Sequence, residues 1–515
     1  MTGTVPPAGD DGVAVAAWLE SGAALGGGGP VKRIDTHAAS IFLVGDRAWK
    51  IKRPVRLGYL DFSTVEARGE VLRAELRLNR RTAPDLYIAV HAITCDDGRL
   101  TLDGAGETID WVLEMRRFPD DALLAHRADR ALLDEPLLRA LADGIVDFHA
   151  RAEVRRGGGA KRIADVVVGN AASMAAVGDI LAPEAAAVLC RRQRDLLERH
   201  AGLLDRRASA GRVRHVHGDL HLGNIAVIGG VPTPFDCLEF DAELATIDVL
   251  YDLAFLLMDL WARDLRAEAN ILFNRYLDRS ADDEDGGVLV PLFMSIRATV
   301  RAHVVAARAR LTGDGDAPAE ARGYLTLAMR LIEPKPARLV AVGGLSGTGK
   351  STLARAIGGL LGPAPGARIL RSDVLRKRGA NVPIETALPP DAYTAGASES
   401  VYAELGRLAG RAIAAGQTVV ADAVFGAPAE RAAIERVADG VGVRFDGVWL
   451  FLPEADRIRR ITGRGPDASD ATAAVARQQS RTIAMPEGGW ITLSAGGDRG
   501  DLARAAIERL HAADR

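Results

Sequence analysis

The sequence predicts two domains of different fold class, an α+β domain followed by an α/β domain with a parallel sheet. The α/β class follows from the regular alternation of strand and helix patterns after residue 338, because parallel strands need crossover helices. The α+β class follows from the earlier part of the chain, where short strand patterns give way to helical ones. Between them, the prolines of Glu333-Pro-Lys-Pro336 cannot continue a helix and favour an extended linker. We expect an N-terminal extension over 1–30, a first domain over 31–332, a linker over 333–337 and a second domain over 338–515.

One stretch of the second domain has the composition of a phosphate-binding loop. Residues 344–351 read Gly-Leu-Ser-Gly-Thr-Gly-Lys-Ser, between an apolar strand pattern at 338–342 and a helical pattern at 351–361. The glycines turn backbone N–H groups toward an anion, Lys350 reaches the terminal phosphates, and the Ser351 hydroxyl holds Mg²⁺. We therefore expect ATP and Mg²⁺ as cofactors rather than a glycine turn that binds nothing. The predicted nucleotide-binding residues are Gly344, Ser346, Gly347, Thr348, Gly349, Lys350, Ser351 and Thr352.

Composition and charge describe a globular chain with two chemically different parts. Of its 515 residues, 48% are hydrophobic and 26% are charged, and the formal net charge is −3. From residue 337 onward there are 23 Lys and Arg and 19 Asp and Glu, against 42 and 49 before it. The two parts therefore carry about +4 and −7, and +4 over such a length is no nucleic-acid-binding arm.

The cysteines, the N-terminus and the apolar runs all favour a cytoplasmic protein without a membrane span. Cys95, Cys190 and Cys237 form no pair motif, which fits a reducing compartment and argues against a disulfide framework. The first residues lack the basic and apolar regions of a secretory signal. The best apolar run, 249–261, contains two aspartates and is too short to cross a bilayer.

The first domain begins with a hairpin that carries lysines and a helix that carries glutamates. Strand patterns at 41–44 and 48–52 flank a turn, and a helical pattern covers 63–80. A strand lysine paired with a helix glutamate holds nucleotide phosphates in several kinases, although surface charges would give the same pattern. The sequence leaves open which residues pair. The candidates are Lys50 and Lys52 on the hairpin, and Glu66, Glu70 and Glu75 on the helix.

A second informative stretch is 217–224, His-Gly-Asp-Leu-His-Leu-Gly-Asn, which is followed by a glycine turn and Asp236. Two loops separated by a turn thus bring Asp219, Asn224 and Asp236 near one another. An aspartate that accepts a hydroxyl proton, with an asparagine and a second aspartate for Mg²⁺, is the set that phosphoryl transfer requires. Farther on, we expect Asp248 to be the N-terminal cap or a first-turn anion of a helix, and Asp252 to bind the backbone of this loop, since buried carboxylates need partners.

A zinc site is the alternative interpretation of this stretch. His215, His217 and His221 include a pair with the four-residue spacing that shares a metal on a helix face. Gly218 and Gly223 disfavour a helix there, and no His-Glu pair supplies a general base. Histidines that only shape a loop are a further possibility, above all for His215.

The stretches 217–224, Asp236 and 248–255 together resemble the catalytic core of the aminoglycoside phosphotransferase family. That family shares the bilobal architecture of protein kinases and includes choline and sugar kinases, so the resemblance implies an α+β bilobal, protein-kinase-like first domain. The chain departs from the family in lacking an obvious nucleotide-covering glycine loop and in offering a second lysine, Lys52. By this resemblance Asp219 is the catalytic base, Asn224 and Asp236 are Mg²⁺ ligands, and Lys50 binds phosphate.

The second domain resembles the small P-loop kinases grouped with gluconate kinase, polynucleotide kinase and the zeta toxins. The fused arrangement is similar to bacterial predicted kinases with an aminoglycoside-phosphotransferase-like front half. Asp422 ends an apolar strand, where a carboxylate binds the Mg²⁺ shell through water, unless it caps a helix. Asp373 is placed like the acceptor-activating aspartate, with Arg376 nearby, and it too has helix capping as an alternative. Arg460 and Arg464 resemble lid arginines that, like Lys350, act on the transferred phosphate.

These observations predict a bifunctional, ATP- and Mg²⁺-dependent phosphotransferase with two separate ATP sites. The expected partners are small-molecule acceptors with a hydroxyl group, such as a sugar, an amino alcohol or an aminoglycoside, and neither nucleic acid nor a membrane. Two alternatives stay open: a polynucleotide 5′-hydroxyl kinase in the second domain, and a nucleotide-dependent regulator without turnover. The acceptor-activating aspartates argue against the regulator, because a switch needs binding only. Acceptor identity depends on pocket shape, which the sequence does not encode, and the oligomeric state also stays open.

Overall fold

The computed structural model describes residues 11–22, 25, 30–36, 38–57, 60–463, 465, 467–486 and 488–512. The chain forms two compact units, residues 1–156 with 213–252 and residues 157–212 with 253–515. Helix α7 (Val249–Ala262) contains the point where the chain passes from the first unit to the second. The predicted linker 333–337 lies between helix α10 (Ala317–Leu331) and strand β13 (Arg338–Gly344). Its role as the domain boundary stays a prediction.

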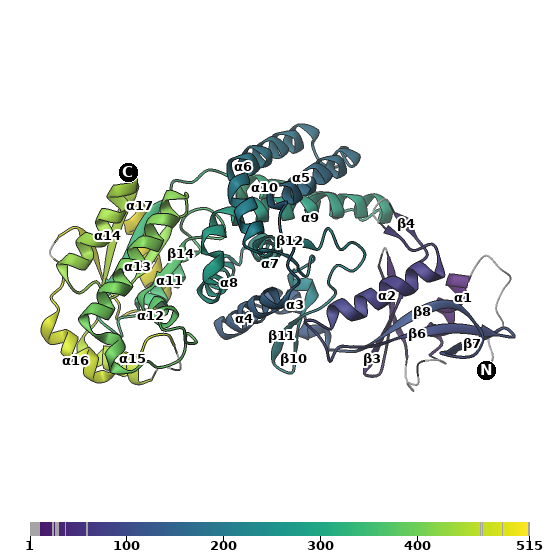
Figure 1. Cartoon of the computed structure of the whole chain (residues 1–515), viewed down its shortest axis with the longest axis horizontal. Coiled ribbons are helices and arrows are strands. Elements are labelled where there is room, and N and C mark those ends of the chain that lie inside the picture. The colour runs from purple at the N-terminus through teal and green to yellow at the C-terminus, as the bar shows by residue number, and fades with distance from the viewer. Residues whose placement is uncertain are drawn as a thin grey trace. The chain divides into compact units, whose positions relative to one another are not determined.

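A six-stranded antiparallel sheet and one long helix form the first part of the first unit (Figure 1). Its elements are α1 (Asp11–Glu20), β1 (Lys32–Asp35), β2 (Ala39–Val44), β3 (Arg47–Lys52), β4 (Arg56–Leu57), β5 (Leu60–Asp61), α2 (Val65–Asn79), β6 (Tyr87–Asp96), β7 (Arg99–Leu102) and β8 (Glu107–Arg116). The strand order is β1-β2-β3-β8-β6-β7, and the predicted hairpin is confirmed by the antiparallel pairing of β2 with β3. Because side chains alternate along β3, Trp49 and Ile51 pack with α1, while Lys50 and Lys52 face α2.

The rest of the first unit carries the predicted catalytic stretch on short elements. They are η1 (Asp120–Ala122), α3 (Leu124–Asp129), α4 (Glu135–Arg151), β9 (Val213–His215), η2 (Leu222–Asn224), β10 (Ile225–Ile228), β11 (Val231–Pro234) and β12 (Thr246–Asp248). Strand β9 pairs with β12, and β10 forms a hairpin with β11. Asp219 therefore lies between β9 and η2, and Asp236 follows β11. These two loops are joined by the hairpin that the sequence indicated.

The second unit begins with a set of packed helices. They are α5 (Gly159–Ala176), α6 (Pro183–Ser209), α8 (Arg266–Arg279), the 3₁₀ segment η3 (Ala281–Leu289), α9 (Val290–Thr312) and α10. In the part of the chain that the structure describes, one helical stretch, Ala281–Thr312, is long and apolar enough to cross a membrane. Of its most apolar window, 67% is buried inside the protein, which is how a core helix of a soluble fold behaves.

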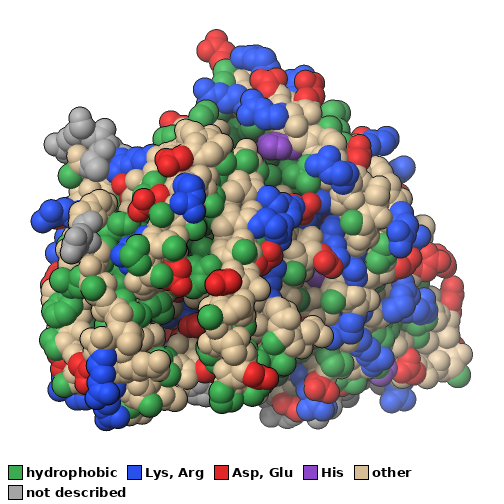
Figure 2. All heavy atoms as spheres, turned by 60° about the vertical axis from the view of Figure 1, so that its left-hand side comes forward, with side chains coloured by type: hydrophobic (Ala, Val, Ile, Leu, Met, Phe, Trp, Pro, Cys, Tyr) green, Lys and Arg blue, Asp and Glu red, His purple; other side chains and the backbone are tan. Residues whose placement is uncertain are grey.

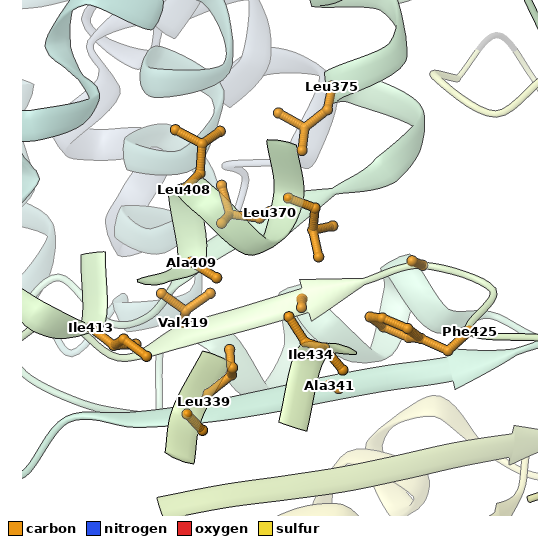
Figure 3. Close-up of a cluster of buried hydrophobic side chains, with 14 of the residues drawn as sticks. Leu339, Ala341, Leu370, Leu375, Leu408, Ala409, Ile413, Val419, Phe425 and Ile434 are labelled. Atoms are coloured by element: carbon orange, nitrogen blue, oxygen red, sulfur yellow. The ribbon is translucent and has the colours of Figure 1, made fainter. Parts of the chain in front are cut away.

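A five-stranded parallel sheet forms the core of the second unit, as the sequence predicted. Its further elements are α11 (Lys350–Gly358), β14 (Arg368–Arg371), α12 (Ser372–Gly379), η4 (Pro390–Tyr393), α13 (Ala395–Ala414), β15 (Val419–Asp422), α14 (Pro428–Val441), β16 (Arg444–Phe451), α15 (Glu454–Thr462), α16 (Ala473–Thr482), β17 (Trp490–Ser494) and α17 (Arg499–Ala512). The strand order is β14-β15-β13-β16-β17. On β13, Leu339 and Ala341 pack toward α13 and α14 (Figure 3), whereas Val340 and Val342 pack toward α11 and α17. Helices cover both faces, which explains why this strand is apolar after Arg338.

Helix α8 covers the open edge of this sheet at strand β14. The Ile369 N–H donates to Asn274 Oδ1 at 2.7 Å, and the side-chain amides of Asn270 and Asn274 donate to the Ala367 carbonyl at 2.9 and 3.1 Å. An uncovered edge strand presents unpaired backbone groups that invite aggregation. Two asparagines therefore satisfy groups that would otherwise need another strand.

A buried arginine strengthens the same contact. Arg368 is 1% exposed and pairs with Glu284 and Asp278 at 2.6 and 2.8 Å, and Arg378 pairs with Glu284 at 3.1 Å. The two carboxylates come from η3 and α8. Because a buried guanidinium depends on its partners, these ion pairs hold β14 and the α12 segment beside the helices.

We predict that Asn274→Ala lowers the free energy of unfolding of the second unit by about 1–3 kcal/mol, because it leaves buried backbone groups of β14 without partners. Urea unfolding of the full chain, followed by tryptophan fluorescence, measures this. Glu268→Ala in the first turn of the same helix is the control and should change the value by less than about 1 kcal/mol. Equal values for the two variants would show that Asn274 does not support the strand.

Candidate functional sites

In the first unit, a buried glutamate joins the two lysines of β3. Lys50 Nζ lies 2.7 Å from Glu75 Oε1, and Lys52 Nζ lies 2.8 Å from Glu75 Oε2. Glu75 is fully buried on α2. The structure thus selects Glu75 from the three candidate glutamates, and it pairs with both lysines rather than with one.

Lys50 also contacts the predicted metal ligand. Its Nζ lies 2.7 Å from Asp236 Oδ1. Burial lowers the pKa of Lys50, but the charges of Asp236 and Glu75 outweigh it and hold the pKa well above its usual value. Burial raises the pKa of Asp236, but the Lys50 charge outweighs it and holds that pKa below the usual range. The backbone N–H of Asp236 donates to the Tyr87 hydroxyl at 3.0 Å, which fixes the residue in a left-handed conformation with φ 57°.

The structure brings Asp219, Asn224 and Asp236 together. Asn224 Nδ2 donates to Asp219 Oδ2 at 2.9 Å and lies 3.4 Å from the Asp236 carbonyl oxygen. The side chains of Asp219 and Asp236 are 40% and 41% exposed, so both are accessible to a ligand. Because the amide nitrogen of Asn224 is engaged by Asp219, its carbonyl oxygen is the atom left to bind a cation.

Asp252 holds the backbone of this loop, as predicted. Its carboxylate accepts hydrogen bonds from the N–H groups of Gly218 at 2.8 Å and His217 at 3.2 Å. It also accepts from His149 Nε2 at 3.1 Å. The predicted capping role of Asp248 is likewise confirmed, since its Oδ1 accepts from the Leu250 N–H at 2.9 Å.

The histidines of this region have separate partners. Burial lowers the pKa of His217, so its ring is neutral near pH 7 and its Nε2–H donates to the Phe235 carbonyl at 3.0 Å. His221 Nδ1 instead accepts from the Gly223 N–H at 3.1 Å. Among the residues that the structure describes, no three His, Cys, Asp or Glu side chains group as metal ligands. The geometry therefore gives no support to the zinc alternative.

In the second unit, the glycine loop has the conformation of a phosphate cradle. Gly344, Gly347 and Gly349 have φ angles of 138°, 86° and 96°, which residues other than glycine rarely adopt. A Cβ at Gly347 would lie 2.7 Å from the Arg457 carbonyl oxygen. Lys350 Nζ donates to the Leu345 carbonyl at 3.2 Å, and burial lowers its pKa despite nearby carboxylates. The loop leads directly into the N-terminus of α11, and the N-terminus of a helix favours the binding of anions.

This loop opens onto a cleft of about 1550 Å³. The predicted site residues that line it are Ser346, Gly347, Thr348, Gly349, Lys350, Ser351, Thr352, Asp373, Arg376, Asp422 and Arg460. Asp422 ends β15 beside β13, so it lies next to the loop by the register of the sheet. Burial raises the pKa of Asp373, which Arg371 only partly offsets. One cleft therefore joins the phosphate loop, the predicted metal carboxylate and the predicted acceptor carboxylate.

The arginines of the cleft have different surroundings. Arg460, on α15, contacts the phosphate loop. Its guanidinium donates to the Thr348 carbonyl at 3.2 Å and to the Ala495 carbonyl at 2.7 Å. Arg376 donates to the Ala392 carbonyl at 2.6 Å and stacks on the Tyr393 ring at 4.8 Å. The predicted lid residue Arg464 lies outside the described residues.

Comparisons with known proteins match the second domain to a family model and most of the chain to relatives. A family model described as an AAA domain matches residues 339–486. The proteins named Uncharacterized protein Rv2004c, from Mycobacterium tuberculosis (strain ATCC 25618 / H37Rv), and Uncharacterized protein Mb2027c, from Mycobacterium bovis, are each 31% identical over 463 residues. Each alignment covers 86% of this chain and 88% of the relative. The chain belongs to the family of these proteins.

Solved structures of kinases are also similar to parts of this chain. A choline/ethanolamine kinase family protein from Mesorhizobium loti is 15% identical to this chain, with a TM-score of 0.38. The alignment covers 62% of this chain and 95% of the chain of that protein. A gluconokinase from Sinorhizobium meliloti 1021 is 22% identical, with a TM-score of 0.25. That alignment covers 35% of this chain and 95% of the gluconokinase chain. The parallel sheet and the glycine loop of the second unit lie within the residues that the family model matches, as expected for a P-loop fold.

Sequence reasoning missed several residues that shape the second site. Gln479 Oε1 accepts from the Ser346 N–H at 2.7 Å and so joins α16 to the phosphate loop. Arg371 lies 3.4 Å from Asp422 and 3.3 Å from Asp467. Asp470 accepts from Lys377, the Tyr393 hydroxyl and the Leu388 N–H. The sequence offered one indication of these contacts, the aspartates at 467 and 470, which follow the predicted lid arginines.

We predict that Asp252→Ala speeds amide exchange at Gly218 by on the order of tenfold or more, because it removes the acceptor of several buried donors. Hydrogen exchange of the full chain, resolved over residues 215–224, measures this. Asp259→Ala on the same helix removes a carboxylate that pairs with the partly exposed Arg263 and should leave that exchange unchanged. Unchanged exchange in Asp252→Ala would show that the carboxylate does not hold the loop.

Proposed function

We propose that the chain is an ATP- and Mg²⁺-dependent kinase that phosphorylates hydroxyl groups of small molecules at two separate ATP sites. One observation carries the proposal. Each compact unit has its own lysine beside carboxylates, its own oxygen groups that fit Mg²⁺ and a further carboxylate, Asp219 or Asp373, that suits an acceptor hydroxyl. We place the boundary between the two catalytic domains at 333–337, with the extension at 1–30, and we expect a cytoplasmic enzyme.

In the first site, Lys50 binds the phosphates of ATP and Asp219 accepts the proton of the acceptor hydroxyl. The Asn224 carbonyl oxygen and the Asp236 carboxylate fit Mg²⁺, because this ion prefers oxygen ligands and both groups lie at the same loop pair. When bound, Mg²⁺ neutralises charge on the transferred phosphoryl group. The 2.9 Å hydrogen bond from Asn224 orients Asp219, so metal and base positions are fixed together.

In the second site, the backbone N–H groups of 346–351 and Lys350 bind the phosphates, and Asp373 accepts the acceptor proton. Ser351 and Asp422 both line the cleft, and their oxygen atoms would hold a Mg²⁺ ion there. The raised pKa of Asp373 makes its carboxylate a stronger base than an ordinary aspartate. Arg460 is close enough to the loop to act on the transferred phosphate, and Arg376 is placed beside the acceptor.

Small molecules are the acceptors that we favour over nucleic acid for the second site. A single-strand binder needs a charged groove and exposed aromatic platforms. Trp449 is buried in the sheet, and Lys377 and Arg371 are engaged by carboxylates. Figure 2 shows Lys and Arg side chains scattered among Asp and Glu over the face that it presents. Lys377 and Arg371 are therefore not available to follow a phosphate backbone.

A screen of alcohols, sugars, amino alcohols and aminoglycosides for ATP consumption tests the proposal. Asp219→Asn should lower turnover of first-site acceptors by roughly 10² or more while ATP affinity stays within about threefold, since this residue meets the acceptor. Asp373→Asn should do the same for second-site acceptors. Asp236→Asn should instead weaken Mg²⁺ and ATP binding at the first site.

Two outcomes would contradict this account. Full turnover of a confirmed acceptor in both Asp219→Asn and Asp373→Asn would remove the proposed bases. Efficient phosphorylation of a 5′-hydroxyl oligonucleotide, lost in Asp373→Asn, would replace the small-molecule acceptor of the second site with a nucleic acid.

A further inference from the structure

Five charged side chains of the first unit form one continuous chain of ion pairs. The order is Asp236, Lys50, Glu75, Lys52 and Glu239, and the successive distances are 2.7, 2.7, 2.8 and 2.6 Å. The two ends of this five-charge network lie three residues apart on the segment that follows β11. The middle comes from β3 and α2. Two lysines of one strand thus hold two carboxylates of one loop through a shared glutamate.

The two ends of the network differ in their exposure. The Asp236 side chain is 41% exposed, whereas those of Lys52 and Glu239 are 3% and 10% exposed. Lys52 Nζ also lies 5.6 Å from the Phe62 ring centroid, as a cation–π contact requires. The Asp236 end is therefore open to a ligand, and the Glu239 end is enclosed by protein.

Sharing Glu75 has a consequence for nucleotide binding. A lysine that turns toward incoming phosphates must weaken its existing ion pairs. Without a second cation, the fully buried Glu75 carboxylate would then lose its partner, and an unpaired buried charge is strongly destabilising. Lys52 stays paired with Glu75 and Glu239 whichever way Lys50 points.

We propose that Lys52 and Glu239 are a positioning pair that fixes the segment 236–239 against β3 and α2, so that Asp236 keeps its place when Lys50 turns to phosphate. The proposal rests on the proposed function of the first site, in which Asp236 is a Mg²⁺ ligand. The backbone of the same segment is ordered by hydrogen bonds from Cys237 N–H to Asn79 Oδ1 at 2.9 Å and from Leu238 N–H to the His217 carbonyl at 2.9 Å. These amides report directly on whether the pair holds the loop.

Lys52→Met in the full chain tests the proposal with two readouts. Amide exchange of 236–239, measured without nucleotide, should become at least about tenfold faster. The Mg²⁺ concentration for half-maximal turnover at the first site should rise about 10- to 100-fold, as for other residues that orient metal ligands. The KM for ATP at saturating Mg²⁺ should change by less than about threefold, since Lys52 does not touch the nucleotide.

Matched variants separate positioning from other roles. Lys32→Met removes an exposed lysine of β1 and should change neither readout. Lys52→Arg keeps the charge and should restore most of the Mg²⁺ response. Glu239→Gln leaves both lysines paired with Glu75 and should show the same changes as Lys52→Met. It replaces Lys52→Met as the test if that variant does not fold. Combining the two substitutions should add little, because they break one pair.

Other results would overturn the inference. Unchanged exchange of 236–239 in Lys52→Met would show that the pair does not position the loop. A loss of ATP affinity as large as that of Lys50→Ala, with normal Mg²⁺ dependence, would make Lys52 a phosphate ligand. If the wild-type first site consumed no ATP, the proposed function would fail there, and the exchange measurement would still decide whether the pair positions the loop.

Discussion

The free-energy cost of an unpaired buried charge organises both candidate sites. In the first unit, the fully buried Glu75 is paired with two lysines, and one of them reaches Asp236. In the second unit, the buried Arg371 lies between Asp422 and Asp467. Removing one member of such a set costs about 3–5 kcal/mol, because the other charge is left without a partner. Each buried ion therefore fixes a carboxylate with a proposed role in binding Mg²⁺, Asp236 on the loop after β11 and Asp422 at the end of β15.

The helices α8 and η3, which precede the P-loop part, support its parallel sheet. Asn274 satisfies the edge of β14, and Arg368 on that strand is paired with carboxylates of the same helical set. Strand β14 continues directly into α12, which begins at Ser372 and carries Asp373. The acceptor carboxylate proposed for the second site is thus supported by residues that lie before the predicted linker. This continuity explains why those helices and the parallel sheet fall within one compact unit.

Local patterns were sufficient to predict the parts of the sites that local geometry determines. The glycine loop was recognisable because its backbone requires left-handed φ at fixed positions, and the loop at 217–224 because its functional side chains are five residues apart. The choice of Glu75, and the roles of Gln479 and Asp470, could not be predicted. These residues act through contacts with residues 25, 133 and 93 positions away, and no spacing rule connects such partners. The pairing of Arg371 with Asp422 could not be predicted either, because only the packed sheet places the two side chains next to each other.

Calorimetric titration of the full chain with a non-hydrolysable ATP analogue and Mg²⁺ tests the central claim of two separate sites most directly. The account predicts about two equivalents bound per wild-type chain. It predicts about one equivalent in Lys350→Ala and one in Lys50→Ala, because each variant loses the phosphate-binding lysine of one site only. A single equivalent in the wild type, or loss of all binding in either variant, would contradict it.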